Sequence, residues 1–256
     1  MALMHTSFFS DVLGMTMSMD VIIPQASKKQ IGMKSVENEG KLKTLYLLHG
    51  MSDDHTIWQR RTSIERYASE LGIAVVMPAA HLSWYTNMAH GLRYFDFIAK
   101  ELPEICRGFF PQMSDKSEDN FVAGLSMGGY GALKAALLAP ENFCCAGCLS
   151  AAFDAADVAK DTANPLWENI FGDADCVKGS ENDLFHVAET LAESGAKLPP
   201  VYIWCGTEDF LYEHNTRMRD HLIKLGYDVT YEESSGDHQW KYWDEKIQTI
   251  LKWIKL

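Results

Sequence analysis

The chain has 256 residues, of which 47% are hydrophobic and 23% charged. This is the composition of an ordinary globular protein, and it excludes a disordered or fibrous chain. Lys and Arg total 23 while Asp and Glu total 35, so the formal net charge is −12. That balance argues against nucleic acid or an anionic membrane as a partner, because both are bound through clustered positive charge.

The N-terminal residues lack the pattern of an export signal. No Lys or Arg precedes residue 28, and Asp11 and Asp20 interrupt the apolar positions. No apolar run approaches the roughly 20 residues that span a bilayer. Three of the cysteines crowd into one apolar stretch, which is a poor layout for disulfides. We therefore expect reduced cysteines and a cytoplasmic protein. The cysteines are Cys106, Cys144, Cys145, Cys148, Cys176 and Cys205.

In chain order, the first predicted element is a short strand at residues 16–23, interpreted as an antiparallel edge strand. Apolar runs that predict buried strands then alternate with stretches of helical spacing. The order is strand 43–49, helix 64–71, strand 73–77, helix 94–105, strand 120–125, helix 131–138 and strand 143–149. Gly72 is expected to cap the first helix, and Pro103 to kink or restart the second.

From residue 154 to residue 200 the pattern weakens, with short helices expected near 166–170 and 184–191. We call residues 154–200 the covering segment, because they resemble an insertion that caps a core. Regular patterns return afterwards, as strand 201–205, helix 211–225, an exposed or edge strand at 227–232, and a final helix at 240–254.

Strands that alternate with helices along the whole chain predict an α/β fold: a mostly parallel central sheet with helices on both faces. The sequence shows no linker, internal repeat or low-complexity segment. We therefore expect a single domain over residues 1–256, with the covering segment as a short cap.

The strongest chemical signal is the sequence Gly124-Leu125-Ser126-Met127-Gly128, a G-x-S-x-G motif between a predicted strand and a predicted helix. A serine on such a sharp turn has a strained backbone, and larger residues two positions away on either side would collide. The turn exposes the Ser126 hydroxyl above the sheet, beside the positive end of the following helix. Ser126 is therefore the candidate nucleophile.

A serine nucleophile needs a base, and the base needs an orienting acid. With this motif the chain order is Ser, then Asp or Glu, then His. His238 fits as the base because it lies in the loop between the last strand and the last helix. The competing histidines lie within predicted helices, from which a base cannot easily reach a serine at a strand end. They are His186, His214 and His221.

Spacing alone does not identify the acid. Glu208 and Asp209 both follow strand 201–205, at the strand end where ligand sites of open α/β sheets gather. Asp154, which follows the preceding strand, is a third candidate.

An oxyanion hole needs two backbone N–H groups. We assign them to Met127, directly after the serine, and to Met51, after the strand that ends at residue 49. Gly50 would let the backbone approach the substrate, whereas His49 is interpreted as structural. Two aromatic residues, Trp84 and Tyr85, follow the next strand in a loop. They either line a substrate pocket or pack beneath the covering segment.

No metal or cofactor is expected. The spacing of Cys144, Cys145 and Cys148 could suggest a metal site, but no second cysteine cluster accompanies it. Cysteines in a buried strand are more often core residues.

The sequence resembles α/β-hydrolases of the esterase D branch, and most of all small bacterial tributyrin esterases. The resemblance implies Asp209 as the acid, since the family's acid stands before an aromatic residue and Leu, and it supports Ser126 and His238. Asp237 departs from the Gly that some members carry before the histidine, and a carboxylate there could perturb His238. The matching motifs span nearly the whole chain: LLHGM (47–51), Trp58, SWYTNM (83–88), GLSMGGYGA (124–132), GTEDFL (206–211) and GDHQWKYWD (236–244).

The resemblance implies a serine carboxylesterase that hydrolyses short-chain acyl esters of small molecules through an acyl-enzyme. A thioesterase like S-formylglutathione hydrolase, a feruloyl or acetyl-xylan esterase, and an acyltransferase are alternatives within the fold. An inactive hydrolase fold used for binding is the alternative of another class, and such proteins usually lose a triad member. The sequence does not identify the natural ester, and it leaves open whether the protein forms a homo-oligomer.

Overall fold

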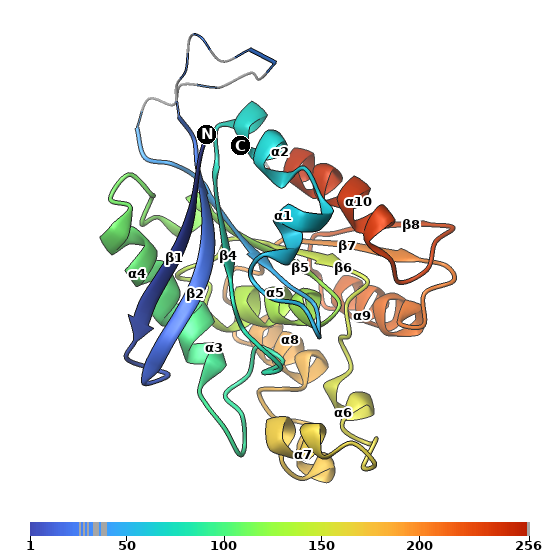
Figure 1. Ribbon diagram of the computed structural model, residues 1–256. Coiled ribbons are helices and arrows are strands. Elements are labelled where there is room, and N and C mark those ends of the chain that lie inside the picture. The colour runs from blue at the N-terminus through green and yellow to red at the C-terminus, as the bar shows by residue number, and fades with distance from the viewer. Residues whose placement is uncertain (26, 28, 30, 33–35, 37–39, 255–256) are drawn as a thin grey trace.

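One eight-stranded sheet forms the centre of the described chain (Figure 1). The computed structural model describes all residues except 26, 28, 30, 33–35, 37–39 and 255–256. The strand order is β1-β2-β4-β3-β5-β6-β7-β8. The strands are β1 (Ala2–Ser10), β2 (Met15–Ile23), β3 (Thr44–Leu48), β4 (Ala74–Pro78), β5 (Asn120–Leu125), β6 (Ala146–Leu149), β7 (Val201–Gly206) and β8 (Val229–Ser234).

The sheet is mostly parallel, as the sequence predicts. Its strand order matches that of the α/β-hydrolase fold. Strands β3 to β8 run parallel, while β2 pairs antiparallel with β4 and β1 antiparallel with β2. All parallel strands therefore deliver their carboxyl ends, and the loops that follow, to one edge of the sheet. Candidate site residues gather at such an edge.

The prediction that residues 16–23 form an edge strand is wrong in its position. This segment is the antiparallel strand β2, but β1 pairs with its outer side and is itself the edge. No apolar run marks β1 in the sequence, because its side chains are mostly exposed or half-buried. At the other edge, β8 pairs only with β7 and is half-exposed, as expected.

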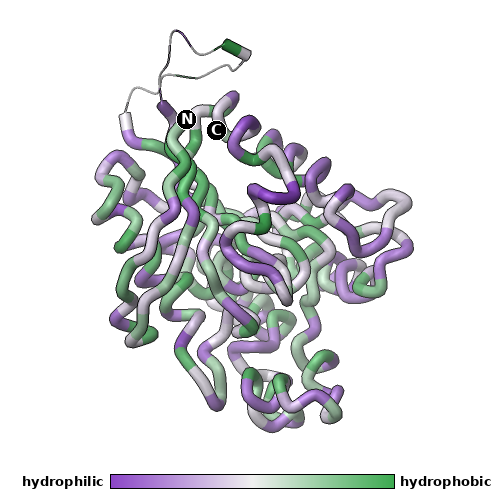
Figure 2. The backbone as a smooth tube through the Cα atoms, viewed as in Figure 1, coloured by the Kyte–Doolittle hydropathy of each residue, from purple (hydrophilic) through white to green (hydrophobic). Residues whose placement is uncertain are grey.

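Helices cover both faces of the sheet (Figure 1). One face carries α1, α2 and α10, and the other carries α4, α5, α8 and α9. In Figure 2 the hydrophobic colour follows the central strands, and polar residues mark the outer loops and helix faces. The α-helices are α1 (Ile57–Arg61), α2 (Ile64–Leu71), α3 (Tyr94–Asp96), α4 (Leu102–Phe109), α5 (Met127–Leu138), α6 (Ala155–Val158), α7 (Pro165–Phe171), α8 (Leu184–Glu193), α9 (Tyr212–Lys224) and α10 (Trp240–Trp253).

Several predicted boundaries shift for local reasons. The helix expected over 94–105 is interrupted by a π-helical turn, Phe97–Glu101, and α4 restarts beside Pro103, whose missing N–H is tolerated in a first turn. Helix α5 begins at Met127 rather than at residue 131, because three glycines hide its apolar periodicity. Strand β6 begins only at Ala146, so Cys144 and Cys145 precede the strand in which they were placed.

The covering segment contains α6, α7 and α8, each begun by a side-chain cap. Asp154, Asn164 and Asp183 accept hydrogen bonds from backbone N–H groups in the first turns of these helices. Helix α8 lies against α5 and α9. Helix α7 is joined to the loop after β4, since the N–H groups of Ala89 and His90 donate to carbonyls at the end of α7 at 2.9 Å.

Helix α5 approaches the sheet very closely at its first turn. A Cβ built on Gly128 would lie 2.5 Å from the Leu48 carbonyl oxygen of β3. A Cβ built on Gly124 would lie 2.4 Å from the Gly128 carbonyl oxygen. Only glycine fits at both positions, so the two glycines set the distance between the start of α5 and the centre of the sheet.

We predict that Gly128→Ala destabilises the protein by about 1–3 kcal/mol, the usual cost of forcing extra atoms into a packed site. Gly108→Ala is the matched control, because Gly108 lies in α4 with open space around its Cα. That change should stabilise the protein by about 0.5–1 kcal/mol, the helix advantage of alanine. Urea unfolding measures both. Equal effects of the two substitutions would contradict the close-approach argument.

Candidate active site

Ser126 lies on the sharp turn between β5 and α5. Its backbone has φ 53° and ψ −118°, a conformation that a residue with a side chain rarely adopts. The surrounding backbone holds it there: the Ser126 N–H donates to the Leu149 carbonyl at 2.8 Å, and its carbonyl accepts from the N–H groups of Gly129 and Tyr130 at 3.0 and 3.1 Å. Ser126 is half-exposed among buried neighbours. The turn thus presents the hydroxyl at the carboxyl edge of the sheet.

The structure brings Asp209 and His238 into contact. The His238 Nδ1 atom lies 2.8 Å from Asp209 Oδ2 and 3.1 Å from Oδ1. The Asp209 side chain is fully buried, while that of His238 is 19% exposed. The Leu211 N–H also donates to Asp209 Oδ1 at 2.9 Å, which fixes the carboxylate in place. Because Nδ1 faces the carboxylate, Nε2 is the ring nitrogen left to exchange a proton with another group.

A close backbone approach joins the loops that carry these two residues. A Cβ on Gly206 would lie 2.0 Å from the Gly236 carbonyl oxygen, so the end of β7 and the loop after β8 touch directly. Glu208 strengthens this junction: its carboxylate accepts from the N–H of Gly236 and, at 3.2 Å, from the Ser235 hydroxyl. These hydrogen bonds, above all the one from Gly236, lower the pKa of Glu208.

The three acid candidates therefore occupy different environments. Asp209 contacts His238, and Glu208 accepts hydrogen bonds from the loop that carries His238. Asp154 has other partners. Asp154 instead caps α6 and pairs with Arg217 Nη1 at 3.0 Å. The geometry favours Asp209, in agreement with what the resemblance implies.

Two aromatic rings lie against His238, and neither is expected at the site from the sequence. Phe210 lies with its ring centroid 4.6 Å from that of His238 and is 75% exposed. Trp243 meets the other side of the imidazole edge-on at 4.8 Å, and its Nε1–H donates to the Ser150 hydroxyl at 3.0 Å. In the sequence, Trp243 is one apolar residue of the predicted final helix, which indicates core packing only. For Phe210 the available signal is an aromatic residue directly after the candidate acid.

Gly50 lies beside the Ser126 turn. A Cβ on Gly50 would lie 3.7 Å from Ser126 Cβ and 2.6 Å from Leu125 Cδ1. The Met51 N–H follows this glycine, and the Met127 N–H is the first of α5, where no helical carbonyl is available to it. Both predicted oxyanion donors thus belong to backbone adjoining Ser126.

The structure places Trp84 and Tyr85 in the interior. Trp84 is 4% exposed and packs edge-on against Trp167 of α7, with ring centroids 5.0 Å apart. Tyr85 is 1% exposed, and its hydroxyl donates to the His49 carbonyl at 2.9 Å. These contacts fit the packing alternative left open by the sequence, and a direct contact with substrate stays a prediction.

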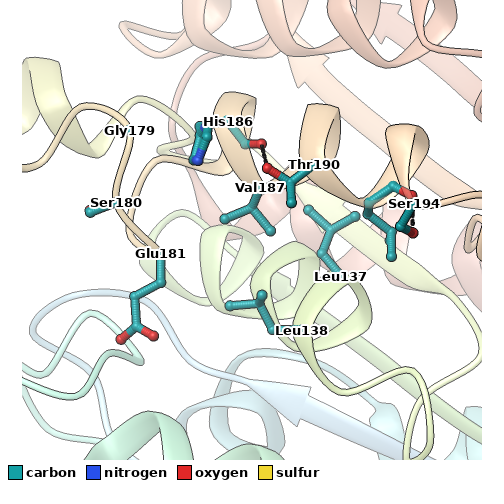
Figure 3. A pocket seen from close by; sticks show the side chains of 10 residues that line it. Leu137, Leu138, Gly179, Ser180, Glu181, His186, Val187, Thr190 and Ser194 are labelled. Carbon is teal, nitrogen blue, oxygen red and sulfur yellow. Dashed lines mark hydrogen bonds between the residues drawn. The ribbon is translucent and has the colours of Figure 1, made fainter.

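The remaining histidine candidates lie in helices, as expected: His186 in α8, and His214 and His221 in α9. A separate pocket of about 340 Å³ lies between the end of α5 and α8, and is lined by Leu137, Val187 and their neighbours rather than by Ser126 (Figure 3). Within the described ranges, no cluster of three or more His, Cys, Asp or Glu side chains is placed to hold a metal ion.

Comparison with known proteins shows the family of the chain. A family model described as "Putative esterase" matches residues 10–254. The chain belongs to this esterase family. An acetyl esterase of Caldicellulosiruptor saccharolyticus is 33% identical over 263 residues, covering 99% of this chain and 98% of the relative.

Two solved structures from Staphylococcus aureus are similar to this esterase over 99% of its chain and 98% of theirs. One is the fluorophosphonate-binding serine hydrolase F with substrate bound, with a TM-score of 0.89 and 38% identity. The other is an S-formylglutathione hydrolase, with a TM-score of 0.86 and 36% identity. Among helices of the described residues, none has the length and apolar character to cross a membrane.

We predict that Asp209→Asn lowers the kcat of this esterase by about 10⁴-fold, because the neutral amide no longer holds the His238 tautomer or stabilises the imidazolium. Glu208→Gln is the matched control: it changes the neighbouring carboxylate in the same way but leaves Nδ1 of His238 paired. Its loss should be far smaller. Steady-state hydrolysis of p-nitrophenyl acetate compares the two, and a larger loss in the Glu208 variant would reassign the acid.

Proposed function

We propose that this esterase is a serine carboxylesterase in which Ser126 is the nucleophile, His238 the general base and Asp209 the orienting acid. The observation that carries the proposal is the 2.8 Å contact between His238 Nδ1 and the buried Asp209 carboxylate. A buried carboxylate in that place stabilises the charged imidazole and fixes its tautomer. His238 Nε2 then accepts the proton of the Ser126 hydroxyl.

The reaction proceeds in two halves. Ser126 Oγ attacks the ester carbonyl while its proton moves to His238, and the oxyanion that forms accepts hydrogen bonds from the Met51 and Met127 N–H groups. The tetrahedral intermediate collapses as His238 returns the proton to the leaving alcohol. Water then gives its proton to His238 and attacks the acyl-enzyme carbonyl. As the bond between the acyl group and Ser126 Oγ breaks, His238 returns the proton to Ser126 Oγ, which releases the acid and restores the hydroxyl.

Short acyl chains are the substrate class we favour. The resemblance to tributyrin esterases and the relative named an acetyl esterase, 33% identical, both support acetyl to butyryl esters. A thioester substrate is the second candidate, because an S-formylglutathione hydrolase is 36% identical over nearly the full chain. A formyl group is smaller than an acetyl group, so both candidates require only a small acyl site.

We predict that Ser126→Ala abolishes turnover of p-nitrophenyl acetate and butyrate. It should also abolish labelling by a fluorophosphonate, since the nucleophilic oxygen is gone. Ser7→Ala, on the exposed edge strand β1, is the matched control and should leave both unchanged. Retained turnover in the Ser126 variant would contradict the mechanism.

A substrate panel separates the two candidates. Tributyrin, p-nitrophenyl acetate, methyl ferulate and S-formylglutathione are compared by kcat/KM with the same enzyme preparation. We expect the short acyl oxygen esters to have the highest values. A higher kcat/KM for S-formylglutathione would identify a thioesterase, and a preference for methyl ferulate would identify a feruloyl esterase.

A further inference from the structure

His49 is a fully buried histidine directly after β3, and both of its ring nitrogens are engaged. Its Nε2 lies 2.9 Å from the backbone N of Ala80, and its Nδ1 lies 2.8 Å from the carbonyl oxygen of Gly50. A backbone N–H can only donate, so Nε2 must be the bare, accepting nitrogen. The proton of the neutral ring then lies on Nδ1 and is donated to the Gly50 carbonyl.

This hydrogen bond fixes one particular peptide group. The Gly50 carbonyl and the Met51 N–H belong to the same planar trans peptide, in which the two bonds point in opposite directions. The Gly50 carbonyl also accepts from the Asp53 N–H at 3.3 Å, which closes a turn around it. With the carbonyl held toward the His49 ring, the Met51 N–H must point away from that ring.

A tyrosine holds His49 from the other side. The Tyr85 hydroxyl donates to the His49 carbonyl at 2.9 Å, and the two ring centroids are 5.9 Å apart. Complete burial raises the pKa of Tyr85 well above its usual value, so the hydroxyl stays protonated and remains a donor. Tyr85 has φ 54°, so the loop that carries it accepts backbone strain at this contact.

We propose that His49, as the neutral Nδ1–H tautomer, is a positioning residue that aims the Met51 N–H at the reacting carbonyl oxygen. This inference rests on the proposed function, because it supplies the geometry of the first oxyanion donor. It goes further by giving His49 a role in transition-state stabilisation without contact with the substrate. We call the three hydrogen bonds of His49, to Gly50, Ala80 and Tyr85, the clamp. They couple three backbone segments, at residues 49–51, 80 and 85.

The charge state of His49 suits this role. Its pKa is lowered to about 4, chiefly by burial; His81 and His55 act in the same direction, and the Gly50 carbonyl and Asp54 oppose them. The ring is therefore neutral at pH 7 and remains so well below the usual pKa of histidine. Protonation would place an N–H on Nε2 opposite the Ala80 N–H and break the clamp.

The first experiment reads the tautomer without reference to activity. Nitrogen-15 NMR of the histidine side chains in the wild-type protein at pH 7 distinguishes a protonated from a bare ring nitrogen. We expect the His49 signals to show a proton on Nδ1 and none on Nε2. A proton on Nε2, or on both nitrogens, would overturn the inference.

The second experiment measures the effect on catalysis. We expect His49→Ala to lower kcat and kcat/KM for p-nitrophenyl acetate equally, by about 10–100-fold, less than the loss of a whole oxyanion donor. His49→Asn keeps a donor near the Gly50 carbonyl and should recover most of kcat. His49→Gln keeps an acceptor near Ala80 but no donor at Gly50, and should resemble His49→Ala.

Two outcomes separate this inference from the proposed function. An active wild type whose His49→Asn variant is no better than the Gln variant, or whose variants change only KM, would overturn the positioning role alone. A wild type that neither hydrolyses esters nor reacts with a fluorophosphonate would overturn the proposed function, and this inference with it. Thermal unfolding of each variant separates misfolding from lost catalysis, and the NMR result stands even where a variant fails to fold.

Discussion

The close approach of helix α5 to the centre of the sheet is the constraint on which the site depends. Gly124 and Gly128 bring backbone against backbone, and no side chain fits between the start of α5 and strand β3. Ser126, between them, is held at φ 53° with its backbone amide and carbonyl both bonded. The backbone strain at Ser126 is thus maintained by packing that the rest of the fold enforces.

The same principle recurs at the neighbouring loops. Gly206 touches the backbone of Gly236, and this contact holds the loop of Asp209 against the loop of His238. On the other side of Ser126, His49 bonds the Gly50 carbonyl. The proposed nucleophile, base and oxyanion donor therefore follow separate strands, and backbone contacts hold their loops at one edge of the sheet. Such preorganisation is what makes electrostatic stabilisation effective in catalysis.

The sequence predicts the regular core well because its signals there are local. Residues 120–125 form β5 with no shift of boundary, and Gly72 caps α2 in the left-handed conformation. Strand β1 escapes prediction because an exposed edge strand needs no apolar run. The start of α5 escapes it because the glycines required for close approach also hide the helical pattern.

At the site, the sequence supplies residue types but not distances. Glu208 and Asp209 are equivalent by spacing, and only the side-chain directions show that one contacts the imidazole and the other the loop backbone. Phe210 and Trp243 reach His238 from different elements, so no single window of sequence relates them. The sequence fits Trp84 and Tyr85 equally well as pocket or core residues, because it does not show their burial, which is nearly complete in the structure.

In the proposed mechanism, Ser126 carries the acyl group during turnover. Acid quenching of the wild-type enzyme during hydrolysis of p-nitrophenyl acetate, followed by peptide mass spectrometry, tests it directly. We expect one acetyl group, attached to Ser126. The acyl-enzyme must be stable to the quench. An acetyl group on another residue, with Ser126 unmodified during ester hydrolysis, would then contradict the role of Ser126 as the nucleophile.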